Sequence, residues 1–147
     1  MGLYNFQKRF VMPIQSGKKR HTIRATRRHP DKVGNIAHLY TGLRIKGATR
    51  LLGRFPIVKI EDIEISAGCV IRGRRCRCLP FHCRRTARIW IDDQELSSDE
   101  REKLARLDGF VDFNEMQRFW KGRLPFRGQI IHWNPQEKRE NAETIKR

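Results

Sequence analysis

Apolar residues recur along the chain with two different periods, which predicts a mixture of helices and strands. In the segment 6–16 they fall close to helical spacing, so that they share one face of a helix. Pro13 interrupts this segment, and we therefore expect a short or broken helix that ends at Gly17. Around residues 19–25 polar and apolar positions alternate instead, which is typical of a half-buried strand.

The same patterns predict the elements of the rest of the chain. Strands are expected at 36–40, 51–65, 87–91 and 126–133. Because Gly53 and Pro56 interrupt the second of these, it is either two segments or one bulged strand. We find neither an internal repeat nor a second domain.

Two helices are indicated by their capping residues. Ser97 and Glu100 match a capping box, and the helix that they open should end at Asp108 and Gly109. Asp112 should cap a second helix that extends to residue 120, whose aromatic side chains we assign to the core together with Trp133. The prediction is an α+β fold in one domain, residues 1–134, with a basic, cysteine-rich insert at about 67–86 and a polar tail at 135–147.

Charge is distributed unevenly along the 147 residues, whose net charge is +16. Residues 1–54 contain 13 Lys or Arg against one acid, Asp31, and residues 72–88 contain seven Arg and no acid. Residues 89–115 reverse the sign, with nine acids against three basic residues. Such a concentrated positive field favours RNA or another polyanion as the partner, over a merely solubilising surface.

The most distinctive stretch is Gly17-Lys18-Lys19-Arg20-His21-Thr22-Ile23-Arg24. In a strand, Arg20, Thr22 and Arg24 would line one face. A hydroxyl between two guanidinium groups, beside an amine, suits a phosphate or the polar edge of a base. Tyr40 could stack on a base or pack in the core. The candidate nucleic-acid-binding residues are Lys18, Arg20, Arg24, Arg27, Arg28, Tyr40 and Arg44.

With Val33-Gly34-Asn35, this stretch resembles the opening of the ASCH domains, members of the PUA-like superfamily, and in particular the small ASCH proteins of phages and prophages. The likeness covers most of residues 6–134. Asn35 stands where an Asp is usual, and the insert at 67–85 departs from the pattern. The other matching segments are Leu39-Tyr40-Thr41-Gly42-Leu43-Arg44, Ala105-Arg106-Leu107-Asp108-Gly109-Phe110, and residues 116–120 and 126–133.

The resemblance implies a small, closed β-barrel with flanking helices and a cleft that faces the first strand. PUA-like domains commonly bind RNA, some ASCH proteins are amidohydrolases acting on acetylated cytidine, and a ribonuclease activity is described in the family. In the amidohydrolases a Lys and a Thr act with a downstream acid. These roles fall on Lys19, Thr22 and Asp108, although the family has a Glu at the last position.

The chemistry of these residues is consistent with catalysis. A Thr hydroxyl needs a base to take its proton, and neighbouring cations or burial would lower the pKa of Lys19 so that a neutral amine could do so. Neither Lys19 nor Thr22 is expected to contribute to core packing. In the alternative interpretation, Lys19 and Arg24 only grip a phosphate and Thr22 is an ordinary strand residue.

Five candidate metal ligands lie within the insert: Cys69, Cys76, Cys78, His82 and Cys83. A loop could bring four of them around a zinc ion. Their spacing does not form paired C-x-x-C motifs, so free buried thiols are the simpler interpretation. We expect no other cofactor.

No apolar run approaches the roughly 20 residues of a membrane span, and the first residues lack the apolar core of a signal peptide. We therefore expect a cytoplasmic protein, of a bacterium or a phage-infected cell, that does not bind membranes. Three classes of function remain open: a nucleic-acid-binding or nucleotide-binding module, with RNA favoured over DNA; an enzyme acting on a modified nucleoside; and a basic factor that binds an acidic protein.

Overall fold

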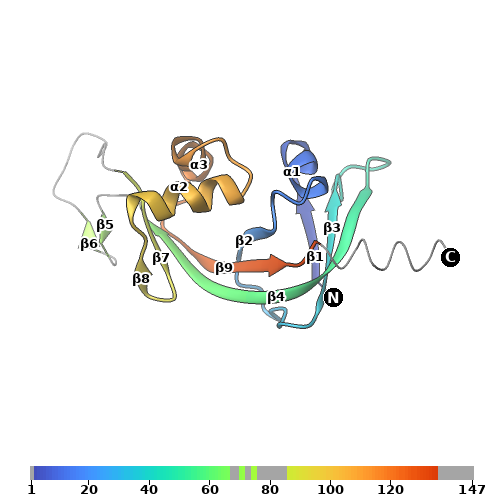
Figure 1. Ribbon diagram of the computed structural model, residues 1–147, viewed down its shortest axis with the longest axis horizontal. Helices are drawn as coiled ribbons and strands as arrows, with labels where there is room; N and C mark the ends of the chain where they lie inside the picture. The colour runs from blue at the N-terminus through green and yellow to red at the C-terminus, as the bar shows by residue number, and fades with distance from the viewer. Residues whose placement is uncertain (1, 67–69, 72–73, 76–85, 136–147) are drawn as a thin grey trace.

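The structure is a computed structural model that describes residues 2–66, 70–71, 74–75 and 86–135. A mixed β-sheet curls into a half-barrel, and the three helices lie together over its concave side (Figure 1). In chain order the elements are β1 (Gly2–Phe6), the 3-10 helix η1 (Lys8–Phe10), α1 (Val11–Gln15), β2 (His21–Ala25), β3 (Ile36–Thr41), β4 (Arg50–Ser66), β5 (Val70–Ile71), β6 (Arg74–Arg75), β7 (Arg88–Ile91), β8 (Gln94–Glu95), α2 (Ser98–Leu107), α3 (Phe113–Trp120) and β9 (Phe126–Trp133).

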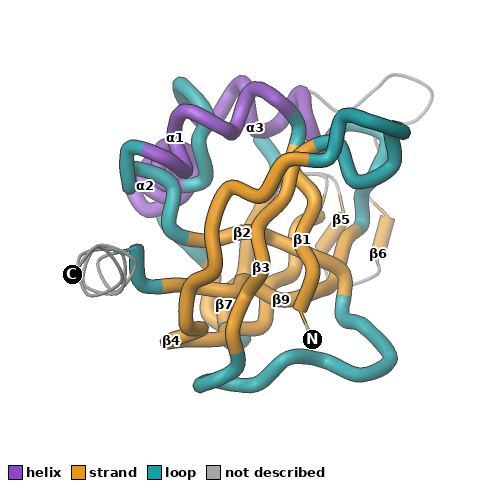
Figure 2. The backbone as a smooth tube through the Cα atoms, turned by 90° about the vertical axis from the view of Figure 1, so that its right-hand side faces the viewer, coloured by secondary structure: helices purple, strands orange, loops and turns teal. Residues whose placement is uncertain are grey.

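Strand β4 organises the sheet, because it pairs with β3 along its first part and with β7 and β9 along its second. β1 joins the other edge of β3 in parallel, and β2 joins the other edge of β9 antiparallel. Strands β5 and β6 form a separate two-stranded sheet. In the view turned by 90°, the strands lie below the helices, and β1 and β3 run side by side (Figure 2). The predicted α+β class and the barrel-like sheet of a single small domain are confirmed.

The predicted strand at 51–65 is one continuous strand with bulges. Its register shifts by one residue opposite β3, where Leu39 pairs with Gly53 and Tyr40 with Leu51. A second shift occurs opposite β9, on either side of Val58. Bulges bend and twist a strand, so they allow β4 to follow the curl of the half-barrel over its 17 residues.

Strand β1 was not expected from the sequence. Tyr4 and Phe6 are 2% and 4% exposed while Leu3, the residue before Tyr4, is 43% exposed, which is the alternation of a strand with one buried face. The helical spacing of Phe6 with Phe10 led the prediction to a helix, which begins only after β1 ends.

The two edge strands β1 and β2 do not pair with each other among the described strands. Instead, the side chain of Arg24 in β2 and that of Arg27, two residues after the strand, reach main-chain carbonyl groups of β1. Arg24 Nη2 donates to the main-chain oxygen of Asn5 at 2.5 Å, and Arg27 Nη2 donates to that of Leu3. The closed barrel that the resemblance implies is therefore a half-barrel whose open seam is bridged by two guanidinium groups.

Both predicted helix caps are present. The hydroxyl of Ser97 accepts from Glu100 N at 3.3 Å while the carboxylate of Glu100 accepts from Ser97 N at 2.9 Å, which completes a capping box. Asp112 accepts from the main-chain nitrogen of Glu115 at 2.8 Å. After α2, Gly109 takes a φ of +101°, a conformation that favours glycine and ends the helix.

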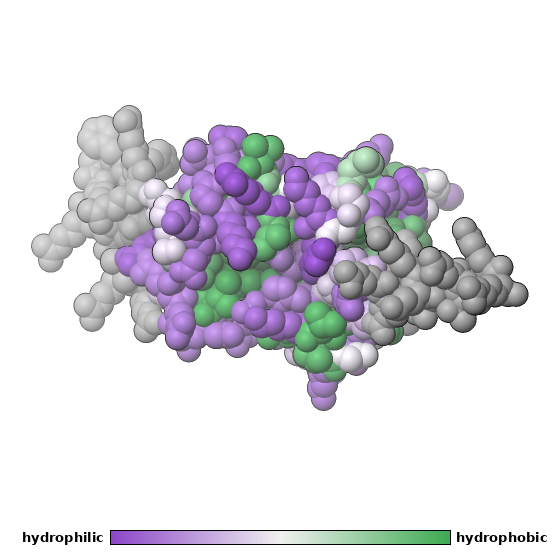
Figure 3. Space-filling model, viewed as in Figure 1, coloured by the Kyte–Doolittle hydropathy of each residue, from purple (hydrophilic) through white to green (hydrophobic). Residues whose placement is uncertain are grey.

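Most of the predicted insert and tail lies outside the described residues. The face in Figure 3 is largely hydrophilic, and hydrophobic residues come to its surface mainly in the middle. None of the helices in the described part of the chain has the length and apolar character that crossing a membrane requires.

Candidate functional site

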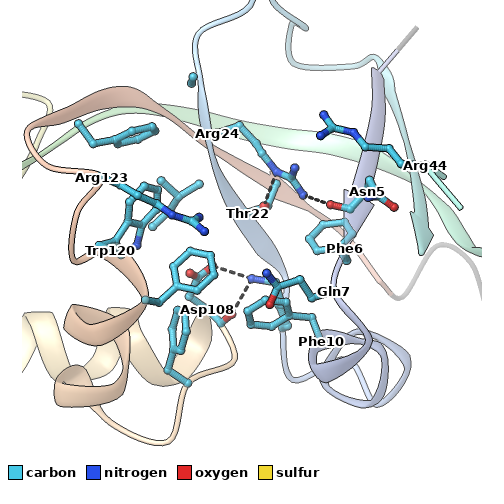
Figure 4. Close-up of a pocket in the computed structure, with 16 residues that line it drawn as sticks. Asn5, Phe6, Gln7, Phe10, Thr22, Arg24, Arg44, Asp108, Trp120 and Arg123 are labelled. Carbon is cyan, nitrogen blue, oxygen red and sulfur yellow. Dashed lines mark hydrogen bonds and ion pairs between the residues drawn. The ribbon is translucent and has the colours of Figure 1, made fainter. Parts of the chain in front are cut away.

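A cleft of about 480 Å³ opens between the first part of the chain and the segment that carries α3. Its polar residues include Asn5 and Gln7 from the β1 end. Three guanidinium groups reach it from three separate segments: Arg24 from β2, Arg44 from the loop after β3, and Arg123 from the loop after α3. Figure 4 shows Arg44 and Arg123 on opposite sides of the cleft with Arg24 between them.

An almost continuous row of aromatic rings forms the apolar part of the cleft. The centroids of successive rings in this row are 4.5 to 5.6 Å apart. The rings, in order, are those of Phe10, Phe110, Phe119, Trp120 and Phe126. The guanidinium of Arg123 lies over the Phe119 ring at 4.5 Å from its centroid. Cations and aromatic faces thus alternate within one concavity, an arrangement suited to a flat anionic ligand.

The floor of the cleft is a buried ion pair. Lys19 and Asp108 are 2% and 5% exposed, and Lys19 Nζ donates to both Asp108 Oδ1 and the main-chain oxygen of Asp108, at 2.6 Å each. The amine also lies 4.9 Å from the centroid of the Phe10 ring. These contacts hold the two charged groups together, although Lys19 and Asp108 are 89 positions apart in the chain.

Two helix ends bring these residues together. Gly17, with a φ of +77°, turns the chain back after α1, and the main-chain nitrogen of Lys19 donates to Pro13 O at 2.9 Å. Asp108 is the C-cap residue of α2, just before the left-handed Gly109. A Cβ at Gly109 would lie 3.0 Å from Phe10 and 3.4 Å from the Lys19 side chain, so a glycine here allows the two helix ends to approach.

Burial perturbs the titration of both partners. It lowers the pKa of Lys19, because a desolvated ammonium is unfavourable, and Asp108 offsets only part of that effect. Burial raises the pKa of Asp108, but the nearby charge of Lys19 and the close approach of the His21 ring outweigh it and hold that pKa below its ordinary value. The carboxylate is therefore ionised, while the amine of Lys19 gives up its proton more readily than an exposed lysine.

Thr22 lines the same cleft but has a different partner. It is 4% exposed, and its Oγ1 accepts from Arg24 Nε at 3.0 Å. In the described part of the chain no hydrogen bond joins Thr22 to Lys19. The expectation that Lys19 and Thr22 contribute nothing to the core is wrong, because both side chains are buried, and that of Lys19 lies beside the rings of Phe6 and Phe10.

The pKa of Lys19 is lowered, as expected, and of the two expected causes burial is the larger. Lys18 and Arg20, its neighbours in sequence, are exposed. Arg20 Nε donates to Gly17 O at 2.8 Å instead. Burial is the main cause of the lowered pKa, with Arg24 as the additional cation.

The predicted nucleic-acid-binding residues do not all line the cleft. Of that set, Arg24 and Arg44 line the cleft. Arg27 packs over the Tyr4 ring at 4.3 Å and holds β1, and Arg28 is exposed in the loop. Tyr40 pairs with Asn5 across β1 and β3 and is half-buried, outside the cleft lining.

Sequence reasoning missed Arg123, Gln7 and the role of the aromatic row. Phe119 and Trp120 were assigned to the core, and Trp120 is 7% exposed, yet both line the cleft. The one feature in the sequence that could have indicated this part of the cleft is Arg123, a cation three residues after the aromatic residues that end α3. Its role could not be inferred from the sequence, because it depends on α3 lying across the cleft from β2.

The four candidate zinc ligands Cys69, Cys76, Cys78 and Cys83, with His82, lie outside the described residues. Within the described ranges, no three His, Cys, Asp or Glu side chains are grouped so that they could hold a metal ion. The cleft itself offers Asp108 as its one carboxylate, already paired with Lys19.

Comparison of the chain with protein-family models, with curated proteins and with solved structures gives no match. The function has to be inferred from the site itself.

Proposed function

We propose that the cleft binds a nucleotide unit of single-stranded nucleic acid, with RNA favoured over DNA. The observation that carries the proposal is the placement of Arg24, Arg44 and Arg123 around a row of aromatic rings in one concavity. A base can stack on such rings, and guanidinium groups bind phosphate oxygens through paired hydrogen bonds. The volume of about 480 Å³ is of the order that small-molecule sites have.

The charge of the chain supports the same function. Residues 1–54, which supply β2 and one wall of the cleft, contain 13 basic residues and one acid. At the floor, Lys19 is neutralised by Asp108, so attraction of phosphate falls to the guanidinium groups at the rim. The resemblance to ASCH domains, whose superfamily commonly binds RNA, is the reason for favouring RNA.

Binding of a fluorescent single-stranded octanucleotide tests this proposal. Arg44→Ala and Arg123→Ala should each weaken binding roughly tenfold, the lower end of what a charged hydrogen bond contributes. Each should also reduce the slope of log affinity against log salt by about one unit per lost phosphate contact. Arg106→Ala, at an exposed site on α2 outside the cleft lining, is the matched control. Equal affinities for all three variants and the wild type would contradict the proposal.

A second candidate is hydrolysis of an acylated pyrimidine nucleoside. It is favoured by one observation: Lys19, with its lowered pKa, and Asp108 lie in the same cleft as Thr22. In such a reaction Thr22 Oγ1 attacks the acyl carbon and its proton passes to neutral Lys19 and then to the departing amine. Water then releases the acyl group. Lys19 must first lose its proton, so the rate should rise with pH through the lowered pKa of Lys19.

Thr22 offers a matched pair of variants for this candidate. Thr22→Val keeps the shape of the buried side chain but removes the hydroxyl, and should abolish turnover of acetylated cytidine. Thr22→Ser keeps the hydroxyl and should retain turnover. Asp108→Glu, which restores the acid of the family pattern, should also retain it. Absence of turnover by the wild-type protein across the alkaline range would exclude the enzyme and leave the binding function.

A further inference from the structure

A surface outside the cleft adjoins its rim: the hairpin that β3 forms with the first part of β4. Ala37 and Leu39 are fully buried on one face of β3, so His38 and Tyr40 lie on the opposite, outer face. The register places Arg54 of β4 opposite His38, and β3 lies between β1 and β4 (Figure 2). The hairpin surface consists of this outer face and of the exposed loop that joins the two strands. Its basic and aromatic side chains are those of His38, Tyr40, Arg44, Lys46, Arg50 and Arg54.

The loop of the hairpin is fixed to the wall of the cleft. Thr41 Oγ1 donates to the main-chain oxygen of Phe6 at 2.8 Å. The main-chain nitrogen of Leu43 donates to Asn5 Oδ1 at 3.1 Å. Asn5 and Phe6 both line the cleft, and Arg44 reaches it beside Asn5 (Figure 4). A chain that leaves the cleft past Arg44 therefore meets the hairpin loop next.

No carboxylate offsets the charge of the hairpin. Residues 32–60 contain six Lys or Arg and no acid. In the part of the chain that the structure describes, Arg44, Lys46 and Arg50 are exposed and form no ion pair. Arg54 Nε donates to His38 Nδ1 at 3.3 Å, and the other N–H donors of this guanidinium have no partner among the described residues. Four cations are thus available to phosphate groups.

The second part of β4 has the opposite charge. Glu61, Asp62 and Glu64 follow the hairpin along the same strand. Lys59 Nζ lies 3.3 Å from Glu61 Oε2. Arg127 Nη2, on β9, lies 3.5 Å from Glu64 Oε1, so these two cations are already paired. A polyanion bound in the cleft is therefore attracted along the hairpin and not toward the second part of β4.

Tyr40 gives the hairpin surface an aromatic ring. The residue is half-buried, and within the described ranges its ring and hydroxyl make no aromatic contact and no hydrogen bond. Its neighbours across the strands are Asn5 and Leu51. Proteins bind single-stranded nucleic acid with this combination of groups, because bases stack on an aromatic ring while cations follow the phosphates.

We propose that the hairpin surface binds the nucleotides that continue from the one in the cleft, with Arg50 and Arg54 on their phosphates and Tyr40 stacked on a base. This inference rests on the proposed nucleotide-binding function. The charge of the surface commits it to a polyanion, and its aromatic ring commits it to one with accessible bases, which is a single strand. Affinity should therefore increase with length beyond the one unit that the cleft holds.

The test compares uridine 5′-monophosphate, which occupies the cleft alone, with the single-stranded octanucleotide. In the double variant Arg50→Ala, Arg54→Ala, affinity for the octanucleotide should fall roughly tenfold, and the salt slope by roughly 0.7 unit per lost phosphate contact. Affinity for the monophosphate should not change. The matched control is Lys59→Ala, Arg127→Ala, which removes the same charge from two exposed side chains of the same sheet and should leave octanucleotide affinity close to that of the wild type.

Tyr40 offers a matched pair that tests stacking without a change of charge. Tyr40→Phe keeps the ring and should bind the octanucleotide as the wild type does. Tyr40→Leu keeps an apolar side chain in the strand but removes the ring, and should weaken octanucleotide binding roughly tenfold. Equal affinities for the two variants would overturn the stacking part of the proposal.

The remaining outcomes separate this inference from the function on which it rests. Unchanged octanucleotide affinity in the double variant would overturn the inference and leave the cleft function standing. An equal loss for both ligands would overturn it as well, because the hairpin would then only support the cleft. So would an equal loss in the control variant, which would indicate net charge alone. Hexaglutamate that binds as tightly as the octanucleotide, with the same loss in the double variant, would assign the surface to an acidic protein instead. Absence of binding of either nucleotide ligand to the wild type would overturn the cleft function and this inference together.

Discussion

The cations at the two ends of β2 have different environments, although they are only a few residues apart in sequence. Lys19, before the strand, is 2% exposed and is paired with the carboxylate of Asp108. Arg24 and Arg27, at and beyond the other end, donate to main-chain carbonyls of β1 and keep part of their surface in the open. A compact ammonium that is fully buried needs a counterion, whereas a guanidinium can satisfy carbonyl groups with some N–H donors and present the others to a ligand.

This difference separates two functions within one basic stretch. The Lys19 end joins two helix ends and gives the cleft a floor of almost no net charge. The Arg24 end closes the seam of the half-barrel and leaves positive charge at the rim. Substitutions at the two ends should therefore differ in what they change, and by how much.

The largest effect is expected from removing the counterion at the buried end. Asp108→Ala leaves the ammonium of Lys19 buried without its partner, and should reduce the free energy of unfolding by about 3–5 kcal/mol. The double variant Lys19→Met, Asp108→Leu removes both charges and should recover most of that loss. Urea unfolding followed by circular dichroism measures both. A loss below about 1 kcal/mol in Asp108→Ala would show that the pair does not hold the helix ends.

A pH dependence follows from the same pair. The pKa of Asp108 is lower in the folded protein than in the unfolded chain. The unfolded chain therefore binds the proton more tightly, and the stability that the carboxylate contributes is fully present above the ordinary pKa of an aspartate. It is lost as pH falls through the lowered value. The difference in unfolding free energy between the wild type and Asp108→Asn should accordingly shrink in acid. A constant difference from pH 6 down to acid unfolding would contradict this assignment.

A smaller effect is expected at the seam. Arg27→Ala removes the donor to Leu3 O and the contact with the Tyr4 ring, and should cost about 1 kcal/mol. The loss should be local, so that hydrogen exchange of the β1 amides accelerates more than that of β9. Equal acceleration in both strands would mean that the guanidinium does not act at the seam.

The smallest effect is expected from the exposed cations beside Lys19. Lys18→Gln and Arg20→Gln change side chains outside the cleft and should alter the unfolding free energy by less than about 0.5 kcal/mol. Their effect on octanucleotide affinity should be smaller than that of Arg44→Ala. If either variant weakened binding as much as Arg44→Ala, the ligand would lie over the exposed side chains of Lys18 and Arg20 and not in the cleft.

Local patterns predicted most of the elements, because their signals lie within a few residues. The capping box at Ser97 and the cap at Asp112 mark two helices whose packing agrees with the pattern. The long strand β4 was predicted with its irregularity, since Gly53 and Pro56 mark it in sequence. Strand β1 was missed because only Tyr4 and Phe6 carry its alternation, and Phe6 also fits a helical period.

The site could be predicted only in part. Lys19, Thr22 and Asp108 were grouped through the resemblance, and the structure brings all three to one cleft. No local pattern indicates a contact across 89 positions. Arg123 and the aromatic row could not be assigned, because their role depends on the face that α3 turns toward β2. The position of His21 opposite His132 could not be predicted either, because it appears only in the strand register.

We propose that the cleft receives the nucleotide unit, and that the exposed cations before and after β2, such as Lys18 and Arg28, do not. Titration of the labelled protein with a single-stranded octanucleotide, followed by NMR, tests it most directly. We expect the indole N–H of Trp120 and the amides around Arg44 and Arg123 to shift first and most, while those around Lys18 and Arg28 change little. Shifts confined to the residues around Lys18 and Arg28, with the Trp120 indole unaffected, would contradict it.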